Sequence, residues 1–172
     1  MTDEAIPDVS DQPLSELQSL TGRVAVVTGG SRGIGEAICL RLAEAGARVA
    51  IVDLDGDAAA ATAKSVSERH GLPCTGYAAN VLDRPALAAA ADGTVEEWGR
   101  LDIWVNNAGI YPAAKLIEMT DDQWDQTLDV NLKGTFIGAQ EAARRMVAGG
   151  RPGAIVNIAS ISGLRSSRGM RG

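Results

Sequence analysis

Short, mostly apolar runs alternate along this chain with longer segments in which apolar residues recur every three or four positions. The runs occupy residues 24–27, 48–53, 73–81, 101–105 and 154–159. Such runs predict buried strands, whereas the wider spacing predicts helices with one apolar face. Strands that alternate with helices of about ten or more residues join into a parallel sheet through right-handed crossovers. The pattern therefore predicts an α/β fold of five parallel strands with helices on both faces.

The helix expected between the first two strands has a regular apolar stripe. The stripe consists of Ile34, Ile38, Leu42 and Ala45, which follow one another at steps of three and four. We expect this stripe to face the core, and Gly46 stands where a left-handed residue closes a helix.

Three further helices are predicted, the first at about residues 56–69. In the second, Asp83 before Pro85 marks an N-cap and a first turn, and the helix ends near Gly99. In the third, Thr120 and Gln123 form a candidate capping box. The apolar face expected for this third helix is made by Trp124, Leu128, Leu132, Phe136 and Met146.

Length and composition fit one globular domain. The chain has 172 residues, of which 45% are hydrophobic and 22% charged, enough to bury a core. We assign residues 21–172 to this domain. Residues 1–20 carry five acidic and no basic side chains, and we expect them to be a flexible extension.

Charge and cysteine usage narrow the classes of function. A net charge of −6 opposes binding to nucleic acid, although three arginines make the last eight residues locally basic. Residues 1–20 lack the basic start of a signal peptide, and no apolar run approaches the about 20 residues that span a bilayer, so we expect a cytoplasmic protein. Cys39 and Cys74 are interpreted as small buried hydrophobes, and with His70 as the only histidine we expect no zinc site.

The turn between the first strand and the first helix is the most informative motif. Its glycines allow a tight turn and close approach of a ligand, and the next helix directs unpaired N–H groups and its positive dipole end to the same place. A dinucleotide pyrophosphate suits that arrangement. The spacing of Gly29, Gly33 and Gly35 differs from G-x-G-x-x-G, and the lysine of a P-loop is missing. An ordinary strand-to-helix connection is the alternative. The candidate cofactor contacts here are Gly29, Ser31, Arg32, Gly33, Ile34 and Gly35.

Other polar residues also follow strands. Asp53 ends the second strand eighteen residues after Gly35, where a ribose-binding acid is expected. Ligands of parallel α/β sheets bind outside the carboxyl ends of the strands. We therefore expect the glycine turn, Asp53, Asn80, residues 106–109 and Ser160 to line one crevice.

These motifs together resemble those of the short-chain dehydrogenase/reductase family. The matching residues are Thr28-Gly29-x-x-x-Gly33-Ile34-Gly35, Asp53, Asn106-Asn107-Ala108-Gly109, Asn131, and Val156-Asn157-Ile158-Ala159-Ser160-x-x-Gly163, in the family's order. The resemblance covers about residues 21–172. It implies a Rossmann-type doubly wound parallel sheet and hydride transfer between a nicotinamide cofactor and an alcohol or ketone. It also implies a homo-oligomer when the protein is full length.

The resemblance also implies roles for individual residues. Ser160 would hydrogen-bond the substrate oxygen, and Asn131, which lies three residues after Leu128 and so close to the expected buried stripe, would help hold a water in a proton relay. The alternatives are a plain turn serine and an amide satisfied by neighbouring backbone. The segment with Asn107, Ala108 and Gly109 either stabilises the centre of the sheet or lies near the cofactor ribose, and Asn80 with Val81 would lie near the adenine.

Two residues bear on the choice between NAD and NADP. The Asp53 carboxylate can accept both ribose hydroxyls of NAD but would face the 2′-phosphate of NADP. Like charges about 4 Å apart repel by about 1 kcal/mol in water and about 4 kcal/mol at a dielectric of about 20. Arg32 could instead pair with that phosphate. We expect NAD, because the acid lies nearer the discriminating group.

The acid–base pair that the resemblance implies, Tyr-x-x-x-Lys, is expected about thirteen residues after Ser160, which is position 173. We therefore expect a chain shortened from a longer enzyme, with residues 154–159 left as an exposed apolar sheet edge. Tyr111 and Lys115 match the spacing literally, but they precede both Asn131 and Ser160. The alternative function is a dinucleotide-binding module without catalysis; a methyltransferase would leave residues 106–109 and Ser160 unexplained.

Overall fold

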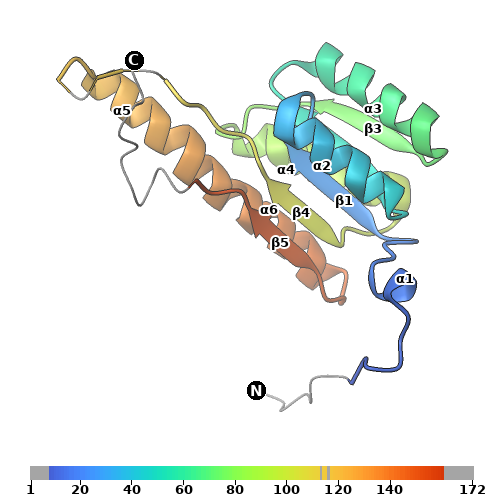
Figure 1. Cartoon of the computed structure of the whole chain (residues 1–172). Helices are drawn as coiled ribbons and strands as arrows, with labels where there is room; N and C mark the ends of the chain where they lie inside the picture. The colour runs from blue at the N-terminus through green and yellow to red at the C-terminus, as the bar shows by residue number, and fades with distance from the viewer. Residues whose placement is uncertain (1–7, 113, 116, 161–172) are drawn as a thin grey trace.

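The computed structural model describes residues 8–112, 114–115 and 117–160, and its fold is a parallel sheet between two layers of helices (Figure 1). The strands are β1 (Val24–Thr28), β2 (Arg48–Asp53), β3 (Cys74–Ala78), β4 (Ile103–Asn106) and β5 (Ala154–Asn157). The helices are α1 (Leu14–Leu17), α2 (Gly33–Glu44), α3 (Gly56–His70), α4 (Arg84–Trp98), α5 (Asp121–Leu128) and α6 (Gly134–Ala148), with a π-helical turn at Asp129–Lys133 between the last two. The predicted α/β class is confirmed.

The strand order is β3-β2-β1-β4-β5, and every neighbouring pair is parallel. From β1 the chain adds β2 and then β3 on one side, and it then crosses back to add β4 and β5 on the other side of β1. The order therefore reverses between β1 and β4, which is the place where a doubly wound sheet opens a crevice for a ligand. The centre of the sheet is the most buried part, since all five residues of β1 are buried.

Two hydrophobic clusters fill the space between the layers. Helices α2 and α3 pack on one face of the sheet around Val27, Val49 and Ile51. Helices α4 and α6 pack on the other face around Leu87 and Trp104. The central strands β1 and β2 thus present apolar side chains to both faces, which is why they appear in the sequence as continuous apolar runs rather than alternating ones.

The side of α2 that meets the sheet differs in part from the prediction. Ile38 and Leu42 are half-buried and pack against the core as expected, but the fully buried residues are Gly35, Cys39 and Ala43, and Ile34 is 67% exposed. The helix approaches the turn after β1 so closely that only small side chains fit between them. The centre of the buried side therefore lies one position away from the predicted stripe.

The face expected for the long helix is buried only at its end. Trp124, Leu128, Leu132 and Phe136 are all exposed, Phe136 by 58%, whereas Met146 is buried as expected. The buried side of α6 also includes Ile137 and Gly138, which were not predicted. A Cβ atom at Gly138 would lie 2.9 Å from Trp104 Nε1, so α6 reaches the sheet through a position that has no side chain. Periodicity located an apolar face but did not identify the one that packs on β4.

The predicted helix starts are confirmed. Asp55 and Asp83 accept hydrogen bonds from the backbone N–H groups of Ala58 and Ala86 at 3.0 and 3.1 Å. Thr120 and Gln123 form both hydrogen bonds of the capping box. Side-chain caps therefore fix where α3, α4 and α5 begin.

A buried aspartate holds the amino ends of β1 and β4 together. Asp102 accepts from the backbone N–H of Val24 at 2.9 Å and from the guanidinium groups of Arg23 and Arg100. Burial opposes ionisation of this carboxyl, but these donors outweigh it and lower its pKa. This pairing fixes the register of the central strands, on which the site at their other ends depends.

The strand β5 is apolar but exposed, as expected for residues 154–159. Ile155, Val156 and Ile158 are 36%, 45% and 44% exposed. Its pairing with β4 extends to the N–H of Ile158, which donates to the carbonyl of Asn106 at 2.9 Å.

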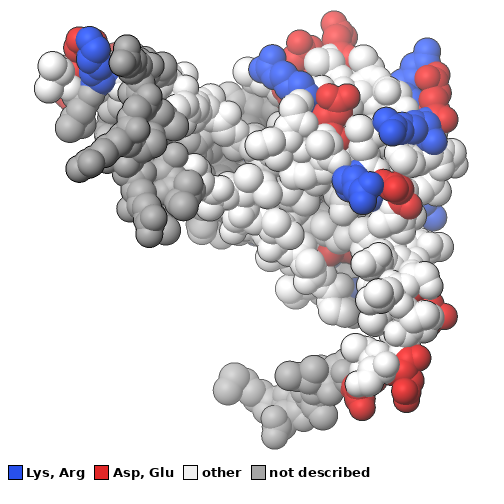
Figure 2. All heavy atoms as spheres, in the orientation of Figure 1, with Lys and Arg blue, Asp and Glu red and all other residues white. Residues whose placement is uncertain are grey.

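The described surface carries charges of both signs. In Figure 2, acidic and basic side chains are interspersed around α2 and α3, and this face has no continuous basic area in its described part. Among the described residues, no helix has the length and apolar character needed to cross a bilayer.

We predict that the two cysteines react at very different rates. Burial, with a smaller contribution from nearby Cys74, raises the pKa of the Cys39 thiol to about 12, and the residue is fully buried. Since the thiolate is the reactive form, iodoacetamide at about pH 8 should alkylate the partly exposed Cys74 first and leave Cys39 unmodified. Peptide mass mapping checks this, with urea-unfolded protein as the control in which both label. Equal labelling of the folded protein would contradict it.

Candidate functional site

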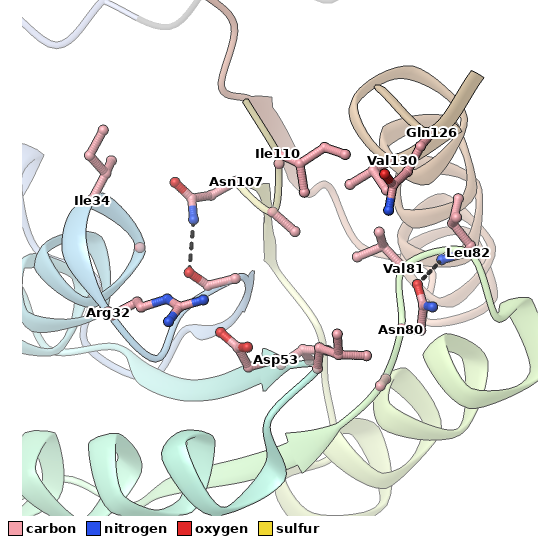
Figure 3. A pocket seen from close by; sticks show the side chains of 17 residues that line it. Arg32, Ile34, Asp53, Asn80, Val81, Leu82, Asn107, Ile110, Gln126 and Val130 are labelled. Carbon is pink, nitrogen blue, oxygen red and sulfur yellow. Dashed lines mark hydrogen bonds between the residues drawn. The ribbon is translucent and has the colours of Figure 1, made fainter. Parts of the chain in front are cut away.

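A cavity of about 480 Å³ opens at the carboxyl ends of the strands (Figure 3). It lies at the reversal of strand order, between the turn after β1, the end of β2, the segments after β3 and β4, and the end of α5. The predicted residues that line it are Gly29, Arg32, Ile34, Gly35, Asp53, Asn80, Val81, Asn107, Ala108 and Gly109. The structure therefore brings ten candidate residues, from four separate strand ends, to one cavity.

The remaining four candidates do not line this cavity. Gly33 begins α2 with a φ of 58°. Ser31 donates hydrogen bonds to Asp53. Asn131 lies in the π-helical turn next to Ile110. Ser160 follows β5 by three residues and is exposed. The expectation of one crevice that also includes Ser160 was therefore too broad for this cavity.

Seven lining residues were missed from the sequence: Val52, Leu54, Ala79, Leu82, Ile110, Gln126 and Val130. Most are direct neighbours of predicted residues at strand ends, so widening each motif by one residue would have found them. Gln126 and Val130 are different, because they come from α5 and the turn after it, four residues apart. Figure 3 shows both facing the loop with Val81 and Leu82. Only the packing of α5 against that loop could reveal them.

The glycine turn is held in place by the end of β4. The side-chain amide of Asn107 donates to the carbonyls of Thr28 and Gly29 at 3.1 and 2.9 Å. Thr28 Oγ1 in turn accepts from the N–H groups of Asn107 and Ala108. This network confirms the stabilising role predicted for the 106–109 segment.

Two glycines in the turn are required for steric reasons. Gly29 has a φ of 63°, and a Cβ atom there would lie 2.8 Å from Ala108 Cα. A Cβ atom at Gly35 would overlap the carbonyl oxygen of Gly29 and lie 2.6 Å from Asn107 Nδ2. The turn and the first turn of α2 are therefore packed backbone against backbone, with no room for a side chain.

The start of α2 differs from the starts of α3, α4 and α5. Its N-cap is Arg32, which makes no side-chain cap hydrogen bond, whereas α3, α4 and α5 are all capped by Asp or Thr. The first N–H groups of a helix need partners, and the helix dipole favours an anion there. Because Arg32, Ile34 and Gly35 line the cavity, this end of α2 offers its donors to a ligand inside it.

Asp53 lies at the end of β2 with most of its acceptor capacity in use. Its Oδ2 atom accepts from both the N–H, at 3.2 Å, and the hydroxyl of Ser31. Its Oδ1 atom accepts from the N–H of Asp55 at 3.3 Å. Each carboxylate oxygen has two lone pairs, so one acceptor position remains, on Oδ1. In this arrangement one acceptor position of Asp53 remains for a ribose hydroxyl.

Asn80 folds back on its own loop. Its Oδ1 atom accepts from the N–H of Leu82 at 2.9 Å, and its backbone carbonyl accepts from Asp83 (Figure 3). The loop that carries Asn80 and Val81 is thereby fixed beside the start of α4.

Asn131 is exposed rather than close to a buried stripe, because the face with Leu128 is itself exposed. Its amide nonetheless pairs reciprocally with the backbone of Ile110, donating to the carbonyl at 2.9 Å and accepting from the N–H at 2.8 Å. The Asn131 carbonyl accepts from the hydroxyl of Thr135 at 2.8 Å. The amide of Asn131 therefore has backbone partners, and the pairing ties the π-helical turn to the chain after β4.

Tyr111 and Lys115 do not form a helical pair. Both lie in irregular chain after β4, and Tyr111 is 67% exposed. Lys115 forms an exposed ion pair with Glu118 at 2.9 Å. The other tyrosine, Tyr77, packs on Gly93, and burial raises its pKa despite a hydrogen bond with Thr94.

Known proteins match most of this chain, including the residues that line the cavity. The model of the short chain dehydrogenase family matches residues 23–171. The chain is 45% identical over 141 residues to D-threitol dehydrogenase of Mycolicibacterium smegmatis, covering 82% of this chain and 54% of that protein. It is 38% identical over 146 residues to sorbitol dehydrogenase of Cereibacter sphaeroides, covering 85% and 56%. The chain thus spans about half the length of these curated relatives.

A solved structure shows the same architecture. Carveol dehydrogenase from Mycobacterium avium, in complex with NAD, superposes with a TM-score of 0.80 at 32% identity. The match covers 86% of this chain and 58% of that one.

Proposed function

Because this chain belongs to the short chain dehydrogenase family, we propose that it binds NAD in preference to NADP and serves hydride transfer between nicotinamide and a small alcohol or ketone. The observation that carries the proposal is a single cavity that joins the uncapped start of α2, the glycine turn and Asp53. When bound, the nicotinamide accepts or supplies the hydride. The residues of this chain bind and orient the cofactor.

The pyrophosphate would lie at the start of α2. That end presents N–H donors without a side-chain cap, and the absence of side chains at Gly29 and Gly35 allows the backbone to approach closely. Arg32 adds a positive charge to the same part of the cavity. These features recognise an anionic group and do not by themselves distinguish one dinucleotide from another.

The preference for NAD would come from Asp53. One lone pair of its Oδ1 is free to accept a ribose hydroxyl, whereas the 2′-phosphate of NADP would place negative charge against the carboxylate. The repulsion estimated for such a pair, about 1 to 4 kcal/mol, corresponds to a preference of about five- to several-hundred-fold.

Ser160 and Asn131 would act on the substrate side. We place Ser160 as the donor to the substrate oxygen and Asn131 as part of a proton relay, because each follows the family's motif in this sequence. Relatives named for threitol and sorbitol make small polyols the first substrates to test. Different polyols have similar carbon chains, so the protein groups that hydrogen-bond their hydroxyls would decide which polyol is the preferred substrate.

A binding function without catalysis is the second candidate. Neither tyrosine of the chain lies one helical turn from a lysine at the cavity: Tyr77 packs on Gly93, and Tyr111 is in irregular chain. NADH binding without turnover of any polyol or ketone would favour this candidate for the 172-residue protein.

We predict that replacing Asp53 removes the cofactor preference. Calorimetric titration of the wild-type chain should give NADH an affinity about five- to several-hundred-fold above that for NADPH. In Asp53→Asn the charge is gone and the shape is kept, so the two affinities should come within about threefold. The matched control is Asp57→Asn, which removes the same charge from an exposed residue outside the cavity lining and should keep the wild-type ratio.

The same titrations can overturn the proposal. If folded wild-type protein binds neither NADH nor NADPH at millimolar concentration, the dinucleotide function is wrong. Equal affinities for the two cofactors in the wild type would remove only the NAD preference.

A further inference from the structure

We propose that Ser31 is a positioning residue for cofactor selection, which holds the Asp53 carboxylate so that a single acceptor position on Oδ1 remains for the ribose. The inference rests on the proposed dinucleotide function and deepens it. Sequence motifs place Ser31 among the contacts of the glycine turn, but the structure puts it outside the cavity lining. Its polar groups contact the acid instead.

Both donors of Ser31 are directed to one oxygen of Asp53. The N–H donates to Oδ2 at 3.2 Å, and the hydroxyl donates to the same atom. The N–H of Asp55 donates to Oδ1. With three donors on two oxygens, the carboxylate cannot rotate about its side-chain torsions without losing hydrogen bonds.

Ser31 is itself fixed from the other side. Its carbonyl accepts from Thr62 Oγ1 at 2.9 Å, and Thr62 is a buried residue of α3 that is 8% exposed. The side-chain cap at Asp55 fixes where α3 begins. The glycine turn, the end of β2 and α3 are thus joined through one serine.

Fixing the carboxylate matters more for rejecting NADP than for accepting NAD. A mobile carboxylate can turn away from an added phosphate and so reduce the repulsion, whereas a held one cannot. Discrimination against a ligand requires that the unfavourable contact be unavoidable. The ribose hydroxyl of NAD, a small donor, can still reach the free lone pair in either case.

The test compares cofactor affinities of the whole 172-residue chain. Ser31→Ala removes the hydroxyl and keeps the backbone N–H, and we expect the ratio of NADH to NADPH affinity to fall about five- to tenfold, mainly through tighter NADPH binding. Ser31→Thr keeps a hydroxyl and should retain the ratio within about twofold. Thermal unfolding of each variant without cofactor identifies any change in stability, which would weaken both cofactors together and leave the ratio unchanged.

A double mutant separates this role from a direct contact with the ligand. In an Asp53→Asn background, Ser31→Ala should leave the ratio unchanged, because the charge that the serine positions is gone. An equal fall of the ratio in both backgrounds would overturn the inference, as would an unchanged ratio in Ser31→Ala alone. A wild-type chain that prefers NADH while Ser31→Ala behaves identically refutes the role of Ser31 and leaves the proposed function intact. A wild type that binds neither cofactor overturns both.

Discussion

Replacing Glu141 with alanine is expected to lower the free energy of unfolding by about 3 kcal/mol, because it leaves partly buried arginines without their counter-charge. Glu141 lies on the buried side of α6 and is 2% exposed. Arg84 of α4 donates to its Oε1 at 2.5 Å, and Arg144 donates to the same oxygen at 2.8 Å. Arg145 pairs with Oε2 and with Asp92 of α4. The carboxylate therefore adds a buried ionic link between α4 and α6, which are also joined by the Arg145–Asp92 pair and by apolar contacts.

The size of the effect follows from how exposed the partners are. Loss of one partner from a fully buried ion pair costs about 3 to 5 kcal/mol. Arg84 and Arg144 reach water, and Arg145 keeps Asp92, so the lower end of that range is expected. Urea unfolding followed by circular dichroism measures the difference. The control is Glu44→Ala, which breaks the exposed Arg41–Glu44 pair and should change the free energy of unfolding by less than about 1 kcal/mol.

Acid should remove the same stabilisation. Burial of the Glu141 carboxyl opposes its ionisation, but hydrogen bonds from Arg145 and Arg84 and the charge of Arg144 outweigh burial and lower its pKa. A lowered folded-state pKa means that stability is present above the unfolded pKa and is lost as the pH falls through the folded value. The difference between wild type and Glu141→Gln should therefore be constant near neutral pH and shrink below about pH 4. A difference that does not change with pH would contradict the ionic origin.

Replacing Gly35 with alanine is expected to weaken NADH binding by more than about 100-fold, which corresponds to about 2.7 kcal/mol. The new methyl group would overlap the carbonyl oxygen of Gly29, and a backbone atom cannot move aside as a side chain does. The start of α2 and the glycine turn must separate, which also breaks the hydrogen bond from Asn107 to Gly29. Calorimetric titration measures the affinity, and thermal unfolding should show an accompanying loss of about 1 to 3 kcal/mol.

Gly22→Ala is the matched control for this variant. Gly22 has a φ of 77°, with no atom within 4 Å of an added Cβ, and it lies outside the cavity lining. Alanine there should cost about 1 kcal/mol of backbone strain and leave NADH affinity unchanged. If Gly35→Ala binds NADH as tightly as Gly22→Ala does, the close packing of turn and helix has no part in cofactor binding.

The sequence predicted best those features that depend on residues close together in the chain. Strand runs, the Asp83 cap and the Thr120 capping box depend on neighbours a few residues apart, and all were predicted correctly. Ten cavity residues were found because parallel strands place their carboxyl ends at one edge of a sheet. Predictions about which side of a helix is buried were only partly correct for α2 and α6, since burial depends on how closely a helix approaches the sheet.

The sequence by itself determined the order of strands and helices, the family, and the set of strand-end residues that a ligand could contact, because these follow from local pattern and motif. Tertiary structure alone decided which of those residues share a cavity, that Gln126 and Val130 join them, and that Ser31 contacts Asp53 rather than the cavity. It also decided that Glu141, a charged residue in a helix, is buried among arginines. The physical reason is that contacts between distant segments depend on helix approach and side-chain direction, and neither is encoded by the spacing of residues within one element.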